Sequence, residues 1–321
     1  KKRICQNCGK EFVIEPEDFE FYQKIGVPEP TFCPDCRLQR RLAFRNERKL
    51  YKRKCDLCGK DIISVYHKDV PFPVYCQKCW WSDKWDPMEY GRDYDFNKPF
   101  FEQFRELFFE VPRYNLCNVN PVNSEYSNIT VDCKDCYLSN STLVSENIIN
   151  SNQVDNSKDC VDCFSLTKGE LAYWCITSHK VYNSIFLIDC RECVDCSFLY
   201  DCRNCQNCFM SSNLRNKSYV FRNRQYDREE YFKKMQDIKR GNWRSLQSYI
   251  REFQILVRDS IHKYAQISYS QNAKGDYLSN CKDIWLGFFG YNSENIRYGF
   301  RFVPTKDSMD ICFVGGERLY E

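Results

Sequence analysis

Small and apolar side chains recur at regular intervals between Asn115 and Arg224. The segments V-D-C-K-D-C-Y-L-S, K-D-C-V-D-C-F-S-L, R-E-C-V-D-C-S-F-L and R-N-C-Q-N-C-F-M-S repeat one theme. Equivalent positions are separated by steps of 11, 11, 11 and 12 residues, and they are Cys163, Trp174, Ile185, Cys196 and Cys208. This period predicts a β-solenoid in which two steps make about one coil and inward Cys and Ser stack from coil to coil. An irregular all-β domain is the alternative.

Turn chemistry supports the repetitive interpretation. Gly169 is the single glycine between Gly91 and Gly241, although many turns are needed there. Asn is abundant instead, and it is the non-glycine residue that best tolerates the left-handed backbone conformation.

Helical periodicity flanks this region. Phe100, Phe101, Phe104, Leu107 and Phe108 share one face of a helix that ends before Pro112, and we expect that face to pack under the next domain.

A capping box formed by Asp227 and Glu230 predicts two further helices, at about 228–239 and 242–263. The second helix carries one apolar stripe that is expected to pack on the solenoid flank. After Ser268 the repeated pattern of small and apolar residues returns.

The chain is therefore predicted to be mixed and mainly β. The expected parts are tandem four-cysteine modules with a basic helix (1–91), an aromatic linker and helix (92–114), a Cys/Asn-rich β-solenoid (115–225), a helical pair (226–266) and a further solenoid-like β segment that is possibly truncated (267–321).

Four C-x2-C pairs precede this body. Each pair brings two sulfurs to one tight turn, and eight cysteines suffice for two tetrahedral zinc sites. The expected ligands are Cys5, Cys8, Cys33 and Cys36 in the first site and Cys55, Cys58, Cys76 and Cys79 in the second. Four thiolates leave no open position at the metal, so both zinc ions are expected to be structural. Strand-like stretches after Cys8 and Cys58, and a helix after Cys36, favour the treble-clef or zinc-ribbon type of module.

The cysteine motifs of the first module resemble those of a known domain family. C-Q-N-C-G-K-E-F followed by T-F-C-P-D-C-R-L-Q-R-R is similar to a small zinc-binding treble-clef domain of many bacterial proteins, over residues 3–41. A second copy over 53–81 keeps the cysteine spacing but has Trp80 and Trp81 where basic residues are expected. The whole chain also resembles cysteine-rich proteins of small-genome candidate-phylum bacteria. The resemblance implies the eight ligands and supplies no function.

A basic stretch separates the two sites. Between Cys36 and Cys55, nine Lys or Arg side chains stand against one acid, Glu47. On a helix that starts near Arg37, spacings of three or four would place five basic residues on one face. The predicted nucleic-acid contacts are Arg37, Arg40, Arg41, Arg45, Arg48, Lys49, Lys52 and Arg53. The alternative is that acidic groups elsewhere in the fold neutralise them.

The 22 cysteines also include two C-x2-C-x2-C triplets. They are Cys190, Cys193, Cys196, Cys202, Cys205 and Cys208. An iron–sulfur or other metal site is one interpretation, and packing inside the solenoid is the favoured one. No signal stretch and no apolar run near 20 residues appears in this sequence, so reduced thiols in the cytoplasm are expected, with no membrane partner.

Catalytic motifs are missing from the sequence. His67, His179 and His262 lie in no recognised motif, and there is no phosphate loop or dinucleotide fingerprint. The sequence therefore predicts a non-enzymatic zinc protein without a small-molecule substrate, acting as an adaptor for RNA or a ribonucleoprotein such as the ribosome. The alternatives are a protein-binding or self-assembling scaffold with purely structural zinc and, less favoured, a metal-dependent nuclease.

Overall fold

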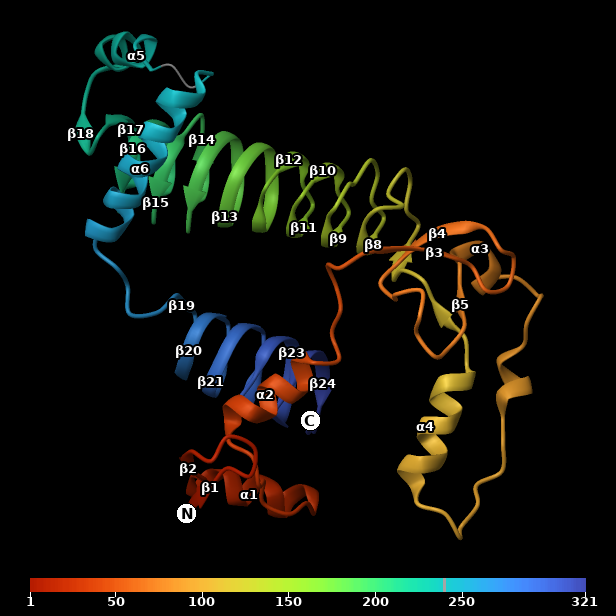
Figure 1. Ribbon diagram of the computed structural model, residues 1–321. Helices are drawn as coiled ribbons and strands as arrows, with labels where there is room; N and C mark the ends of the chain where they lie inside the picture. The colour runs from red at the N-terminus through yellow and green to blue at the C-terminus, as the bar shows by residue number, and fades with distance from the viewer. Residues whose placement is uncertain (239–240) are drawn as a thin grey trace. The chain divides into compact units, whose positions relative to one another are not determined.

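The computed structural model of the chain describes residues 1–238 and 241–321, which form two compact units. The first unit combines residues 1–46 with 262–321, and the second unit covers residues 47–261. The tandem modules expected as one part over 1–91 are thus divided between the units. Each unit holds one cysteine-rich module and one stack of coils (Figure 1).

The first unit begins with a hairpin and two helices. Strands β1 (Lys2–Ile4) and β2 (Glu11–Val13) are antiparallel, and helices α1 (Pro16–Ile25) and α2 (Pro34–Leu42) follow. Gly26 ends α1 in the left-handed conformation, with φ 71°.

The coils of the first unit lie near the other end of the chain. Their strands are β19 (Ile267–Ser268), β20 (Gln271–Ser279), β21 (Lys282–Tyr291), β22 (Glu294–Arg297), β23 (Phe300–Met309) and β24 (Cys312–Glu317). All their pairings are parallel. Leu278, Ile284, Ile296 and Phe302 are buried between them.

The second unit opens with its own module. Strands β3 (Tyr51–Lys54) and β4 (Asp61–Ser64) form a hairpin, and β5 (Val74–Tyr75) precedes the short helix α3 (Gln77–Trp80). A connector with the 3-10 helix η1 (Pro87–Tyr90) leads to α4 (Phe100–Glu110) and β6 (Arg113–Tyr114). Because β6 pairs in parallel with β5, the module is joined to the start of the coils that follow.

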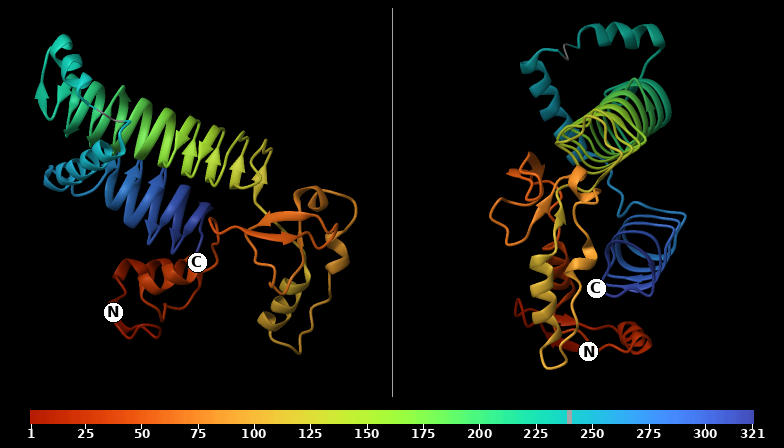
Figure 2. Two further views of the ribbon diagram at one scale, coloured as in Figure 1. Left: turned by 45° about the horizontal axis from the view of Figure 1, so that its top comes forward. Right: turned by 90° about the vertical axis from the view of Figure 1, so that its right-hand side faces the viewer.

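A long stack of coils follows in the second unit. Its strands are β7 (Asn118–Val119), β8 (Asn128–Val131), β9 (Asn140–Leu143), β10 (Glu146–Ile149), β11 (Asn152–Asp155), β12 (Lys158–Val161), β13 (Phe164–Ile188), β14 (Arg191–Val194), β15 (Ser197–Tyr200), β16 (Arg203–Ser212) and β17 (Arg215–Phe221), with β18 (Arg224–Gln225) turning back antiparallel on β17. The right-hand view of Figure 2 looks along such coils and shows each as a closed loop of chain. The predicted solenoid-like, mainly β architecture is confirmed.

The predicted coil length is wrong. Asn152 pairs with Phe164 and Cys193 pairs with Cys205, so one coil takes 12 residues, not two steps of 11 or 12. The error arose at Trp174, which packs in an outer aromatic cluster and does not belong to the inward row. The same holds for Ile185.

Each coil is built from triplets. Every third side chain points inward, as Cys190, Cys193 and Cys196 do, and these three are fully buried. The residue before most inward positions has a left-handed backbone, with φ 54° at Asp189 and 53° at Glu192. Asn and Asp fill many of these positions, which confirms the expectation that Asn replaces glycine in the turns.

Inward hydroxyl and thiol groups bond to the backbone of the next coil. Ser151 Oγ accepts a hydrogen bond from the N–H of Cys163 at 3.0 Å and donates to the carbonyl of Ile149 at 2.8 Å. The Cys163 thiol contacts the carbonyls of Val161 and Ala172 at 3.3 and 3.7 Å. Inward serine and cysteine side chains such as these are therefore satisfied inside the coils.

Two helices cover one end of the long stack. Helices α5 (Arg228–Gln236) and α6 (Trp243–Asp259) lie close to the two predicted ranges but are shorter, and residues 239 and 240 lie outside the described residues. Phe253 of α6 is buried against Phe198, whose ring stacks on Phe186 at 4.7 Å. The expected packing of this helix on the coils is confirmed. Among the residues that the structure describes, no helix is both long and apolar enough to span a bilayer.

Candidate metal centres and the basic segment

The first four-cysteine site lies between the β1–β2 turn and the start of α2. Cys5 and Cys8 come from the turn, whereas Cys33 is the N-cap residue of α2 and Cys36 lies in its first turn. The four sulfur atoms lie within 4.8 Å of one another. The predicted ligands are therefore brought together as one set.

Backbone amides surround these sulfurs. The N–H of Cys33 donates to Cys5 Sγ at 3.2 Å, and the side-chain amide of Asn7 donates to Cys36 Sγ at 3.3 Å. Burial alone raises the pKa of Cys5, but amide hydrogen bonds, led by that of Cys33, outweigh it and lower the pKa to about 6. Gly9, with φ 72°, lets the turn curl so that its amides face the thiolate.

The second site repeats this geometry. Cys55 and Cys58 follow β3, Cys76 is the N-cap residue of α3 and Cys79 lies within that helix. Their sulfurs also lie within 4.8 Å of one another. Burial raises the pKa of Cys55, yet hydrogen bonds from the backbone amides of Cys76, Cys58 and Leu57 outweigh it and lower the pKa to about 7. Gly59 has φ 71°, matching Gly9 in the first module.

Both sulfur sets suit zinc. Four thiolates within this separation match a tetrahedral zinc site, in which each Zn–S distance is about 2.3 Å. A helix N-terminus at the second cysteine pair further favours the thiolate form. The protein thus binds zinc at two four-cysteine sites, and zinc would supply a crosslink with no free coordination position.

Comparison with known families agrees with this assignment. Residues 1–45 match the family described as "Probable treble clef domain". No curated protein matches the chain. The family match covers the first module, and the second module is assigned from its matching geometry.

The basic segment does not form the continuous helix expected from residue 37 to residue 52. Helix α2 ends at Leu42, and the chain becomes a strand again at Tyr51. Arg45, Arg48 and Lys52 lie beyond the end of α2, so they do not extend the basic face that Arg37 and Arg41 form on this helix.

The arginines of α2 face the last coils of the first unit. Arg37 is buried, and its Nε lies 2.9 Å from Asp310 Oδ2. Arg41 Nη1 lies 3.4 Å from Asp310 Oδ1, and Arg40 pairs with Glu321. These carboxylates are the neutralising groups that the alternative interpretation required.

The remaining predicted contacts are distributed differently. Arg45 lies over the ring of Phe313. In the second unit, Arg48 donates to Asn152 Oδ1 at 2.9 Å.

On β3, Arg53 is buried and pairs with Asp56 at 2.7 Å. Lys52 is exposed, and Lys49 lies 5.5 Å from the ring of Tyr51. Lys54, not named from sequence, shares the exposed face of β3 with Lys52.

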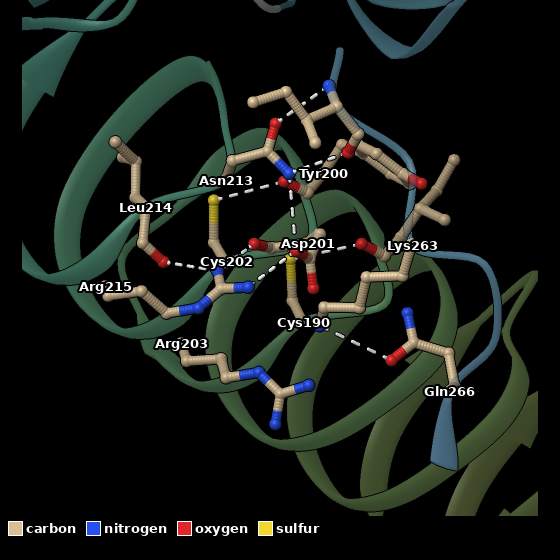
Figure 3. A network of polar contacts seen from close by, with 12 residues as sticks. Cys190, Tyr200, Asp201, Cys202, Arg203, Asn213, Leu214, Arg215, Lys263 and Gln266 are labelled. Atoms are coloured by element: carbon tan, nitrogen blue, oxygen red, sulfur yellow. Dashed lines mark hydrogen bonds and ion pairs between the residues drawn. The ribbon is translucent and has the colours of Figure 1, made fainter.

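The six triplet cysteines lie inside the long stack, and among the described residues they do not meet the geometry of the two metal sets. Cys193 Sγ contacts the carbonyls of Arg191 and Cys202 at 3.4 and 3.8 Å. Figure 3 shows the thiols of Cys190 and Cys202 in neighbouring coils, with the buried carboxylate of Asp201 beside them bonded to Arg215. This environment favours the packing interpretation.

Sequence reasoning missed the acidic partners of the first module. Asp310 is fully buried, and Asp18 is buried where Tyr298 Oη donates to it at 3.0 Å. Asp310 has the left-handed backbone, with φ 55°, of the position before inward Ile311, where Asp and Asn recur throughout the coils, so coil phasing does not mark its carboxylate as buried.

Proposed function

We propose that the protein is a non-enzymatic scaffold in which zinc modules close and stabilise solenoid-like coils. The observation that carries this proposal is the buried pair of Arg37 and Asp310. Helix α2 begins with two zinc ligands and ends with the arginines that contact the last coils. Zinc binding and coil closure are therefore linked through one short helix.

Packing in the first unit supports this role. Met309 of β23 is fully buried in the same apolar cluster as Cys5, Phe12 and Tyr22 of the zinc module. Tyr320 lies against Phe21 and Tyr22, with ring centroids 6.1 and 5.9 Å apart. The module thus covers apolar surface that a bare end of the coils would expose.

The second unit repeats the principle with different contacts. Asn115 Nδ2 donates to the carbonyl of Ile63 at 2.7 Å, and the Asn115 N–H donates to the carbonyl of Tyr75 at 3.0 Å. Side-chain amides of Asn128 and Asn140, in successive coils, donate to the carbonyl of Glu47. Each stack of coils is thus joined to a zinc module within its own unit.

Hydrogen exchange tests the link between zinc and the coils. We expect removal of zinc by a chelator to raise the amide exchange rate in β23 and β24 by at least about tenfold. Without zinc, these strands can open locally without first disrupting a metal-stabilised module. Arg37→Met should raise the same exchange with zinc still bound. Unchanged exchange in β24 after zinc loss would overturn the proposal.

RNA or ribonucleoprotein binding is the second candidate. Lys52 and Lys54 project from β3, and Lys68 lines the same hollow. Asp56 and Asp61 also line this hollow, so the positive potential is confined to the immediate surroundings of the lysine side chains. This candidate rests on lysines that remain exposed, not on the arginines of α2.

Salt dependence of binding to an unstructured RNA tests this candidate. Each phosphate contact contributes a slope of about 0.7 in log K against log salt. The double variant Lys52→Ala and Lys54→Ala should lower this slope by an amount that corresponds to about one to two phosphate contacts. Binding that is absent, or unchanged in this variant, would remove RNA from consideration at this hairpin.

A further inference from the structure

A row of basic side chains runs along the long stack of coils in the second unit. Its members are His179, Arg191, Arg203 and Arg215, and each is the in-register partner of the next in a parallel pairing. Neighbouring strands of a sheet lie about 4.8 Å apart, so these side chains repeat at about that interval. Three consecutive coils therefore present a guanidinium at the same position.

Other charged rows on these coils alternate in sign. Lys134 and Lys158 lie on either side of Glu146, with Nζ–carboxylate distances of 3.1 and 3.7 Å. Lys180 likewise lies 2.9 Å from Glu192 of the next coil. Opposite charges at facing positions of neighbouring strands stabilise a sheet, whereas like charges there destabilise it. The arginine row does not follow this alternation, so its side chains repel one another.

The acidic groups beside the row have other partners. The buried carboxylate of Asp201 binds Arg215, at the end of the row. Asp189 accepts a hydrogen bond from the hydroxyl of Thr177. These two carboxylates therefore do not pair with the guanidinium groups in the middle of the row.

Arg191 and Arg203 form that middle part. Arg191 is exposed and Arg203 is half-buried, and neither makes an ion pair in the part of the chain that the structure describes. Figure 3 shows the Arg203 guanidinium apart from the contacts that hold Arg215. Burial lowers the pKa of Arg203, and the charges of Arg191 and Arg215 lower it further. The carboxylates of Asp201 and Asp189 oppose this shift without reversing it, so an anion from outside would relieve the repulsion.

The positive potential continues beyond the arginines. Burial lowers the pKa of His179. The charges of Lys180, Arg191 and Lys168 lower this pKa further, and Glu192 opposes them only in part. A polyanion that follows the row would therefore remain in a positive potential over several coils.

We propose that this row binds the phosphate backbone of a single-stranded nucleic acid that runs along the axis of the coils. A guanidinium donates two parallel hydrogen bonds to two oxygens of one phosphate, which an ammonium group does not do. The alternating rows place Lys against carboxylates, so Arg in three consecutive coils favours phosphate as the ligand. Contacts to phosphates carry no base information, so binding is independent of base sequence. The inference goes beyond the scaffold function and does not depend on the lysines of β3.

Fluorescence anisotropy with a labelled deoxythymidine oligonucleotide tests the proposal. We expect the full chain to bind this probe with a salt slope of at least about two phosphate contacts, at about 0.7 per contact. The double variant Arg191→Gln and Arg203→Gln should weaken binding at least about tenfold and remove about two contacts from the slope. Arg203→Lys keeps the charge but not the paired donors, so it should weaken binding less than Arg203→Gln does.

Two readouts separate loss of the row from loss of the fold. Arg203→Gln removes one of several like charges, so its thermal unfolding midpoint should equal or exceed that of the unchanged chain. Lys158→Gln is the matched control, because it removes a cation from a row of alternating charge. This control should bind the oligonucleotide as the unchanged chain does.

Helix α4 supplies a second control. Phe100, Phe104 and Phe108 are 55%, 49% and 41% exposed, so the expectation that this face packs under the next domain is wrong for the described residues. Bases stack on exposed aromatic rings in many proteins that bind single strands. Phe104→Ala should nevertheless leave binding unchanged, because the row contacts phosphates and not bases.

Four outcomes would overturn the proposal. They are no binding by the full chain, full binding by the double arginine variant, loss of binding in Phe104→Ala, and equal displacement of the probe by polyglutamate. The last outcome would mean that carboxylates serve the row as well as phosphates do. The hydrogen-exchange response of β24 to zinc does not involve this row, so it reports separately on the scaffold function.

Discussion

Arg37 and Asp310 form an ion pair that is almost completely removed from solvent. Their side chains are 3% and 0% exposed, and Nε and Oδ2 lie 2.9 Å apart. Burial raises the pKa of Asp310, while the charges of Arg37 and Arg41 oppose that rise. Loss of Asp310 would leave the buried charge of Arg37 without its carboxylate, and loss of Arg37 would leave Asp310 with only the longer contact to Arg41.

We predict that Arg37→Met lowers the free energy of unfolding by about 3 kcal/mol, because it leaves the buried Asp310 with only the longer contact to Arg41. Arg40→Met is the matched control, since Arg40 is 47% exposed where it pairs with Glu321. That change should cost no more than about 1 kcal/mol. Denaturant unfolding measures both, and equal effects would mean that the buried pair has no special structural role.

The ligand sets were predictable because C-x2-C pairs encode local geometry. Cys5 and Cys8 share one turn, and Cys33 and Cys36 share one helix start, so few arrangements were open to them. The partner of Arg37 was not predictable in this way. Asp310 lies near the other end of the chain, and a charged face looks the same in sequence whether it meets solvent or a carboxylate.

The coil period was misread for a related reason. Trp174 is apolar like an inward residue, but its side chain packs on the outside against the aromatic cluster that includes α6. Here both the inner and the outer surface of the coil carry apolar side chains, so hydrophobicity alone does not tell which surface a residue occupies. The spacing of three between Cys190, Cys193 and Cys196 contained the correct signal, since it matches the inward triplet positions.

Elemental analysis should find two zinc ions per chain. Cys33→Ser removes one ligand of the first set and should reduce the count to one, because three ligands hold a structural zinc ion far less tightly. Cys117→Ser changes an exposed cysteine outside both sets and should leave the count at two. Additional zinc or iron would instead assign metal to the triplet cysteines.

Substitution at Cys193 tests the packing role of the triplets. Ser145 and Ser157 occupy inward positions in other coils, so Cys193→Ser should cost less than about 1 kcal/mol. Cys193→Leu adds volume in a filled core and should cost about 1–3 kcal/mol. Both values come from denaturant unfolding. A serine variant as unstable as the leucine variant would show that the sulfur itself is required.

Val144 is a β-branched residue held in the left-handed conformation, with φ 47°. Asp132 and Asn156 lie one coil before and one coil after it, so Asn at this position would extend a polar row. We predict that Val144→Asn stabilises the fold by about 1 kcal/mol, measured by thermal unfolding. Val119→Asn is the control, because Val119 is similarly exposed but its φ is not positive. Equal effects of the two changes would contradict the conformational explanation.

We predict that Asp155 makes the stability of the second unit dependent on pH. Burial raises the pKa of Asp155 from 3.8 to about 6, while the Leu143 amide opposes this rise. Between these pH values the folded state binds more protons than the unfolded state, so stability should fall as pH rises from about 4 to about 6. Asp155→Asn removes the charge, and it should stabilise the protein on the order of 2 kcal/mol at pH 7 and little at pH 4. Unfolding curves at both pH values measure the difference, with the exposed Asp93→Asn as control. A gain from Asp155→Asn that is the same at both pH values would mean that ionisation of this carboxyl is not its cause.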